Sequence, residues 1–169
     1  MTRPILSDAF GHHHWATIRL IDACLPLTQD QLATVVPGTF GTILDTMRHI
    51  VGADAGYLFV LTDGAVTEVE EAAMSLDELR AAEVGFGERW AALVAQDLDP
   101  DRVLVRTRED GSKSLAPLGI RLAQVLHHGS DHRSQVCTAL TVLGIEPPAI
   151  DAWDYAAKDG RLSEVPPPA

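Results

Sequence analysis

Residues 125–136 read VLHHGSDHRSQV, so that His128 and His132 stand four positions apart. On an α-helix this spacing puts both imidazoles on one face, and it is one of the few ways in which a single helix offers two ligands to one metal ion. At about 100° per residue, Val125 and Val136 fall within roughly 40° of His132. The stretch therefore predicts a helix whose apolar, core-facing side carries two histidines.

The spacing alone leaves two interpretations open. A buried histidine commonly serves as a hydrogen-bonded core residue, and the chain contains seven histidines. The alternative is a metal site that a third ligand from another helix would complete. A zinc-protease site of the His-Glu-x-x-His type is excluded, because Gly129 stands where that motif needs its glutamate.

Length and composition indicate one soluble domain over residues 1–169. The chain has 169 residues, of which 46% are hydrophobic and 22% charged, which is ordinary for a globular protein. A net charge of −11 argues against nucleic acid and against an anionic membrane surface as partners. Neither a membrane span nor an apolar secretory leader is evident, so a cytoplasmic location is expected.

The pattern predicts an all-α fold built on four long helices packed around one core. Ser7 or Asp8 is expected to cap the first helix, and a capping box of Ser75 with Glu78 is expected to open the third. Between the third and fourth helices, extended structure is expected over 102–108 and a hairpin turn over 109–112, as part of a small two-stranded excursion. An aromatic tail over 145–169 is expected to pack on the bundle. The four helices are predicted over residues 6–25, 39–61, 75–97 and 116–143.

The second predicted helix offers the candidate third ligand, His49, with Asp45 one turn before it on the same side. Small residues such as Gly56 share that face and would leave space for a metal ion and a substrate. The bulky apolar residues of the helix project on the opposite side, so a surface position for His49 is equally compatible with the pattern. The run His12-His13-His14 fans out around its helix and is expected to be partly exposed, with the alternative that one of the three lines the mouth of a pocket.

Taken together, these segments resemble the DinB superfamily over nearly the whole chain. The family's tryptophan-containing first helix resembles residues 14–25, its second helix resembles 39–50, and its aromatic C-terminal segment resembles 150–155. Residues 128–135 are similar to its His-x-x-x-His-Arg-x-Gln segment. Two departures are Ser134, where relatives often carry glycine, and Asp131, where many carry another histidine.

The resemblance implies an up-down-down-up four-helix bundle and a divalent metal ion held by His49, His128 and His132. Zinc and nickel both suit nitrogen ligands. With no fourth protein ligand expected, the ion would keep an open position for a water molecule or a substrate. Asp45 is the candidate group to orient His49 and to act as general base, and Gln135 is expected to help fix the fourth helix.

Three functions fit such an open site. The resemblance favours a metal-dependent transferase or isomerase that uses a low-molecular-weight thiol. The alternatives are a metal-dependent hydrolase and a metal-binding stress-response protein without turnover. A homodimer formed by packing helices is expected from the resemblance, and the substrate is expected to be a small molecule.

Overall fold

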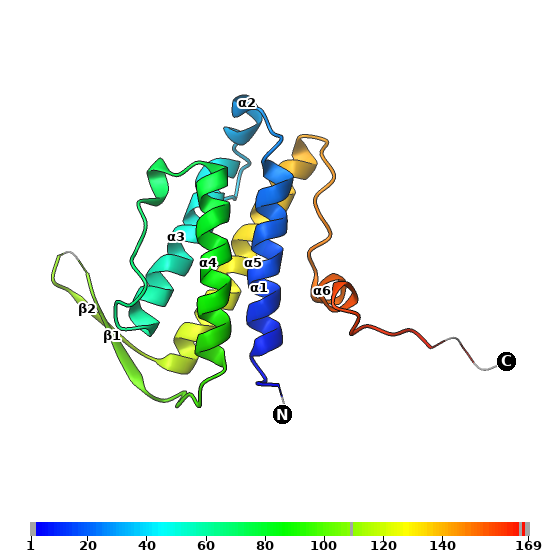
Figure 1. Ribbon diagram of the computed structural model, residues 1–169. Coiled ribbons are helices and arrows are strands. Elements are labelled where there is room, and N and C mark those ends of the chain that lie inside the picture. The colour runs from blue at the N-terminus through cyan, green and yellow to red at the C-terminus, as the bar shows by residue number, and fades with distance from the viewer. Residues whose placement is uncertain (1–2, 109, 166, 168–169) are drawn as a thin grey trace.

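The computed structural model describes residues 3–108, 110–165 and 167, and the chain in this range is mostly helical (Figure 1). The expectation of a helical fold with one small hairpin is confirmed. Glu109, in the predicted hairpin turn, lies outside the described residues. The elements are α1 (Ser7–Cys24), α2 (Gln29–Leu32), α3 (Ile43–Leu61), the 3-10 turn η1 (Glu71–Ala73), α4 (Leu76–Val94), β1 (Val103–Thr107), β2 (Lys113–Pro117), α5 (Leu118–Val142) and α6 (Ala152–Lys158).

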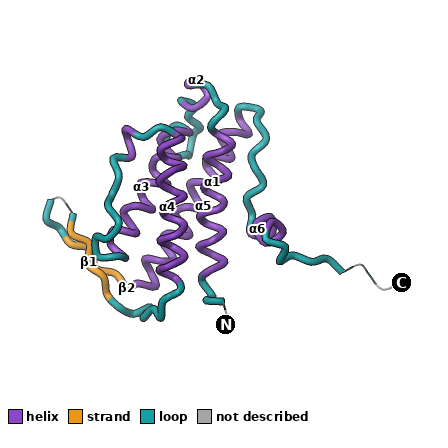
Figure 2. The backbone as a smooth tube through the Cα atoms, in the orientation of Figure 1, coloured by secondary structure: helices purple, strands orange, loops and turns teal. Residues whose placement is uncertain are grey.

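The four long helices α1, α3, α4 and α5 lie side by side (Figure 1, Figure 2). In the view of Figure 1, α1 and α5 run upward, whereas α3 and α4 run downward. Because α3 and α4 run in the same direction, the connection 62–75 has to return along the length of α3 before α4 begins. The antiparallel pair β1–β2 joins α4 to α5, with Val105 opposite Leu115.

The helix ends follow local capping chemistry, and α4 ends at Val94 rather than near residue 97. The capping box of Ser75 and Glu78 is present. The second long helix begins at Ile43 rather than near residue 39, because Thr42 is its N-cap and accepts a hydrogen bond from the Asp45 backbone N–H. The predicted cap of the first helix is wrong: Leu6 occupies the N-cap position and makes no side-chain cap bond.

The core is a single cluster of apolar side chains drawn from all four long helices. It supplies the main stabilisation, at about 1.5–3 kcal/mol for each fully buried large side chain. Its largest fully buried members are Trp90, Phe10, Leu20, Ile21, Ile43, Met47, Ile50, Leu58, Leu79, Leu118 and Leu140.

A polar network runs through this core. His12 and His14 are partly exposed, as expected, whereas His13 belongs to this network and corrects the expectation at that position. His13 is only 1% exposed. Its Nε2 lies 2.8 Å from Asp54 Oδ2, and its Nδ1 lies 3.1 Å from Nη1 of Arg133. Since a guanidinium can only donate, His13 accepts at Nδ1 and donates from Nε2. The His13 ring on α1 thus links Asp54 of α3 to Arg133 of α5.

A second part of the network joins α1 to α4. His14 Nδ1 lies 3.1 Å from Oε1 of Glu83, and Oε2 of Glu83 is buried without a partner among the described residues. Burial, with a contribution from the nearby Asp54 carboxylate, raises the pKa of Glu83 well above its usual value. The carboxyl of Glu83 is therefore held in its neutral form over a wider pH range than an exposed glutamate.

The C-terminal segment contacts α1 through α6. The Tyr155 hydroxyl sits against Gly11, where a side chain would collide with it, and His12 Nε2 donates to the carbonyl oxygen of Ile150 at 2.8 Å. Trp153 is different, because its side chain is 70% exposed.

Over the described residues, none of the helices combines the length and the apolar character needed to cross a lipid bilayer.

The raised pKa of Glu83 predicts a pH-dependent stability. A raised folded-state pKa contributes stability below about pH 4.5, and this contribution is lost as pH rises through the folded-state value, by up to about 1.4 kcal/mol per pH unit. Glu83→Gln mimics the neutral acid, so this variant should be the more stable protein at pH 7–8 and its stability should depend less on pH. Urea unfolding from pH 4.5 to 8.5 measures the difference, with the exposed Glu88→Gln as control. Parallel profiles for wild type and Glu83→Gln would contradict the assignment.

Candidate metal centre

Three histidines from two helices converge on one point. His49 comes from α3, and His128 and His132 come from successive turns of α5. One ring nitrogen from each lies within 4.8 Å of the others, and the Nε2 atoms of His49 and His128 are 3.0 Å apart. All three residues are partly buried. The structure thus brings together the three residues that the resemblance implied, and the surface position considered for His49 is not observed.

The side-chain amide of Gln135 contacts Nδ1 of His132, the ring nitrogen here called outer because it is not the one proposed to bind the metal ion. This Nδ1 lies 3.1 Å from Oε1 of Gln135, which leaves Nε2 as the nitrogen free to accept a metal ion. The same amide oxygen accepts the backbone N–H of Phe40 at 2.8 Å, and the amide nitrogen donates to Asp131 at 3.1 Å. Gln135, predicted to fix the fourth helix, therefore fixes a candidate ligand and the loop that covers it.

The outer nitrogen of His49 faces a carboxylate that the sequence analysis missed. His49 Nδ1 lies 3.8 Å from Oε1 of Glu71, just beyond hydrogen-bond length. The Glu71 carboxyl rests against the backbone of α3 at Gly52, and any side chain at position 52 would collide with it. A glycine on α3 therefore allows a carboxylate from η1 to reach the imidazole.

These donors fit a divalent metal ion. A tetrahedral ion with bonds of about 2.1 Å holds its ligand atoms about 3.4 Å apart. The Nε2 atoms of His49 and His128 are 3.0 Å apart and all three donors lie within 4.8 Å of one another, which is compatible with this value. The His49 ring has Glu71 beside it, and the His132 ring has Gln135, as neighbouring groups suited to orient the rings. Nδ1 of His128 is buried without a partner among the described residues, and its Nε2 faces the cluster.

The electrostatics of the cluster also suit metal binding. Burial, followed by the neighbouring His132 and His49, lowers the pKa of His128 to about 4. Burial, with His132 second, lowers the pKa of His49 as well. Imidazoles with lowered pKa values remain neutral at physiological pH, which is the form that binds metal ions.

Aromatic rings cover the cluster. Phe40 stacks on His49 with ring centroids 4.0 Å apart and an 8° angle between the planes, and its edge-on contact with His132 is 5.3 Å. Tyr57 meets the His128 ring edge-on at 5.9 Å. This apolar cover reduces the local dielectric and strengthens interactions between the cluster and a bound charge.

Asp45 is not part of the histidine cluster. Its carboxylate is 53% exposed and lies 3.8 Å from Nη1 of Arg48. Its predicted roles as orienting group and base stay predictions, whereas Glu71 is the carboxylate that faces the outer nitrogen of His49. Sequence spacing did not indicate Glu71, because it belongs to an irregular connection with no helical period to relate it to His49.

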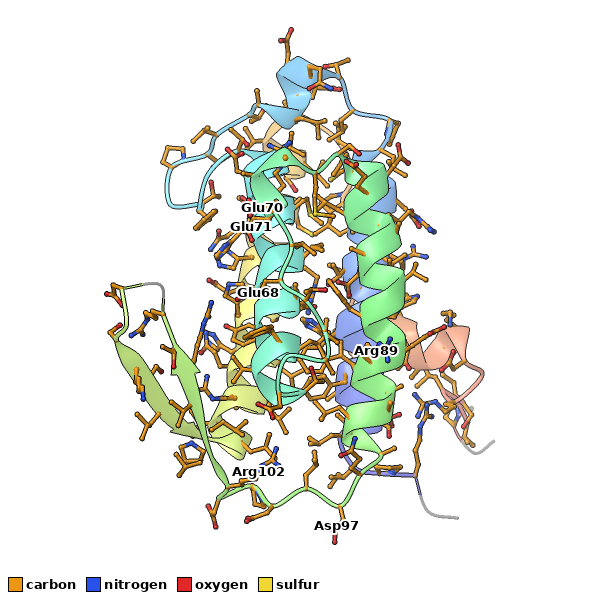
Figure 3. All side chains as sticks on the ribbon, turned by 60° about the vertical axis from the view of Figure 1, so that its left-hand side comes forward. Glu68, Glu70, Glu71, Arg89, Asp97 and Arg102 are labelled. Carbon is orange, nitrogen blue, oxygen red and sulfur yellow. The ribbon has the colours of Figure 1, made fainter. Side chains whose placement is uncertain are left out.

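A cavity of about 860 Å³ adjoins the cluster and is lined by both His49 and His128. Its walls are α3, the connection that returns along α3, and the hairpin. Glu68, Glu70 and Glu71 lie along that connection in front of α3 (Figure 3). Arg106 of β1 pairs with Glu68 at 3.2 Å, and this pair lies over Gly56. The space that small residues on α3 were expected to provide is thus present beside the histidines.

Comparison with known proteins agrees with the geometry. The sequence profile of the DinB family matches residues 1–162. This chain belongs to the DinB family. The three-histidine cluster of this DinB protein is consistent with metal binding. No curated protein matches the sequence significantly.

The contact between Glu71 and His49 gives a prediction with two independent variants. Glu71→Gln removes the charge, and Gly52→Ala should displace the carboxylate while leaving it in the chain. Each variant should weaken zinc binding by about 10–100-fold, the usual effect of losing a group that orients a ligand. Competition with a chromophoric chelator measures the affinity.

Glu70→Gln serves as the matched control, since it makes the same charge change at the neighbouring position of the cavity wall. An alanine at position 52 favours the helix over glycine, so loss of folding is not expected. Unchanged affinity in both Glu71→Gln and Gly52→Ala would contradict the role of Glu71.

The lowered pKa of His128 gives a second prediction, for the metal-free protein. Its imidazole should titrate near pH 4 in an NMR titration rather than near 6.5, with the signal assigned by comparison with His128→Asn. Because the unfolded chain takes up this proton first, the metal-free protein should lose stability as pH falls from about 6.5 to about 4. A midpoint near 6.5 would contradict the buried, mutually repelling arrangement of the three rings.

Proposed function

We propose that this protein is a metal-dependent enzyme that uses a low-molecular-weight thiol in a transfer or isomerisation reaction on a small molecule. The observation that supports it best is the three-histidine cluster at the wall of the 860 Å³ cavity. A divalent ion bound by His49, His128 and His132 would act as a Lewis acid and lower the pKa of a coordinated thiol, so that the thiolate is available at neutral pH.

The chain's own residues would prepare the site in three ways. Glu71 and Gln135 would orient the imidazoles of His49 and His132 from outside. Phe40 would shield the same two rings from water. The cavity has the size of a typical small-molecule site, and it would hold the electrophilic partner beside the thiol.

Zinc or nickel is the proposed ion, because both suit a set of nitrogen ligands. The proposed scaffold is a single domain over 1–169 that forms an up-down-down-up bundle of α1, α3, α4 and α5, which the run directions in Figure 1 support. We also propose a homodimer that acts in the cytoplasm, as the family resemblance and the sequence suggest. The net charge of −11 argues against nucleic acid and anionic membranes as partners.

Metal-assisted hydrolysis is the second candidate, and the position of Glu71 favours it. A carboxylate at the edge of the cluster is suitably placed to accept a proton from an attacking water molecule. Burial raises the pKa of Glu71, which brings it closer to the range in which a carboxylate works as a base. A metal-binding stress-response protein without turnover is the remaining alternative.

Metal content tests the shared premise of these functions. Purified wild-type protein should contain about one divalent ion per chain, and His49→Ala, His128→Ala and His132→Ala should each lose most of it, because two imidazoles bind far more weakly than three. Elemental analysis measures the ratio, and His127→Ala is the control on the same helix. Full retention of the ion in all three variants would refute the site.

Cobalt substitution separates the three functions. A thiol-dependent enzyme should show a new thiolate-to-cobalt absorption band when a thiol such as cysteine or glutathione is added, and an oxygen analogue of the thiol should produce no such band. A hydrolase should turn over ester or amide substrates without any thiol. A protein that only binds metal should show neither behaviour, and that result would overturn the proposal of an enzyme.

A further inference from the structure

A second site is indicated by Arg133, a buried cation that lacks a direct ionic partner. The residue is 4% exposed. The buried carboxylates nearest in the network, Asp54 and Glu83, pair with His13 and His14 instead, and no carboxylate of the described residues forms an ion pair with Arg133 within 4.0 Å. Asp54 reaches this guanidinium only through the His13 ring, so Arg133 can still pair directly with an anion.

The guanidinium has unused donors. Its hydrogen bonds to the described residues all leave from Nη1 and reach neutral acceptors: Nδ1 and the carbonyl oxygen of His13, and Oγ1 of Thr17. Nε and Nη2 make no hydrogen bond to the described residues, and neither atom is completely buried. The edge formed by Nε and Nη2, which carries two parallel N–H groups, therefore has hydrogen-bonding capacity that the described residues leave unused. That geometry matches the two oxygens of a carboxylate.

Arg133 lines a cavity of about 600 Å³ between α1, α5 and α6. Its polar lining includes the Ser130 hydroxyl, and its apolar lining includes Leu126 and the exposed indole of Trp153. One carboxylate lies at this cavity, that of Asp8, and it is already paired with Arg161 at 2.8 Å and with Arg3 at 3.3 Å. Among the described residues that line this cavity, the guanidinium groups of Arg133 and Arg161 thus outnumber the carboxylate of Asp8.

This cavity is separate from the metal centre. Residue 133 follows His132 directly, but on a helix it projects about 100° away from it. The residues that line the two cavities do not overlap. Whatever occupies the cavity beside Arg133 would therefore not compete directly for the cluster of His49, His128 and His132.

We propose that the cavity between α1, α5 and α6 binds a small organic carboxylate with an aromatic body. The carboxylate would pair with the Nε–Nη2 edge of Arg133, and the ring would pack against Trp153 and Leu126. The volume suits a ligand of one or two rings. This inference stands independently of the proposed enzymatic function.

The experiment uses phenylacetate as probe, with the uncharged phenylacetamide as its matched control. Calorimetry measures binding to the purified protein, and quenching of tryptophan fluorescence reports on the indole, with Trp153→Phe identifying the responsible residue. We expect phenylacetate to bind with a millimolar or lower dissociation constant and phenylacetamide to bind at least 10-fold more weakly. Absence of phenylacetate binding, or equal affinity for the two probes, would overturn the proposal.

Two variants on α6 locate the ligand. Ala156 lines the cavity, and Ala157 is exposed outside its lining. Ala156→Phe should fill the cavity and weaken phenylacetate binding at least 10-fold, whereas Ala157→Phe should leave it unchanged. Equal binding by these two variants would overturn the location. Arg133→Gln should also lose binding, and the two α6 variants keep the test decisive if that substitution prevents folding.

A final variant separates this site from the metal centre. Phenylacetate binding should survive in His132→Ala, which disrupts the proposed metal site. Loss of binding in His132→Ala with retention in Ala156→Phe would mean that the anion binds at the metal centre, and would overturn this inference while leaving the proposed function standing.

Discussion

The hydrogen-bonded contact of His13 with Asp54 and Arg133 is the interaction on which the arrangement of the long helices depends. It joins α1, α3 and α5 inside an otherwise apolar core, with every member nearly inaccessible to water. Breaking a buried pair of this kind typically costs about 3–5 kcal/mol, because the remaining charge stays buried. Apolar packing tolerates small sliding of one helix on another, whereas directed bonds of about 3 Å do not. The network therefore fixes how the helices are aligned.

That alignment sets the geometry of the metal centre. Asp54 lies five residues after His49 on α3, and Arg133 lies next to His132 on α5, so the network and the cluster share the same two helices. A shift of α3 against α5 by one residue, about 1.5 Å, would move His49 relative to the α5 histidines by several times the tolerance of about 0.2 Å that metal coordination allows. The buried polar network and the three candidate ligands thus lie next to each other along α3 and α5.

The sequence predicted what is encoded locally. The period of the apolar residues identified the four long helices, and the box of Ser75 with Glu78 identified the start of α4, because both depend on neighbours a few residues away. The i, i+4 spacing on α5 gave two of the candidate ligands. The second helix offered His49 as a third, and the resemblance favoured it over a surface position. The burial of His13 and the approach of Glu71 could not be predicted, because each depends on a contact between segments that no periodicity relates. The fold class and the three histidines could be predicted from the sequence, whereas the Glu71 carboxylate beside them could not.

Two glycines show how the sequence nevertheless encodes these contacts between distant segments. Gly129, between the α5 ligands, has no space for a side chain because the His13 ring lies against it, and Gly52 on α3 has none because Glu71 does. Each lies inside a helix, where glycine costs about 1 kcal/mol relative to alanine. In both cases the missing side chain admits a polar group from another segment to the neighbourhood of the three histidines. An interior glycine on a helix that carries candidate ligands therefore marks where a distant segment approaches, and the geometry of this centre depends on both positions remaining glycine.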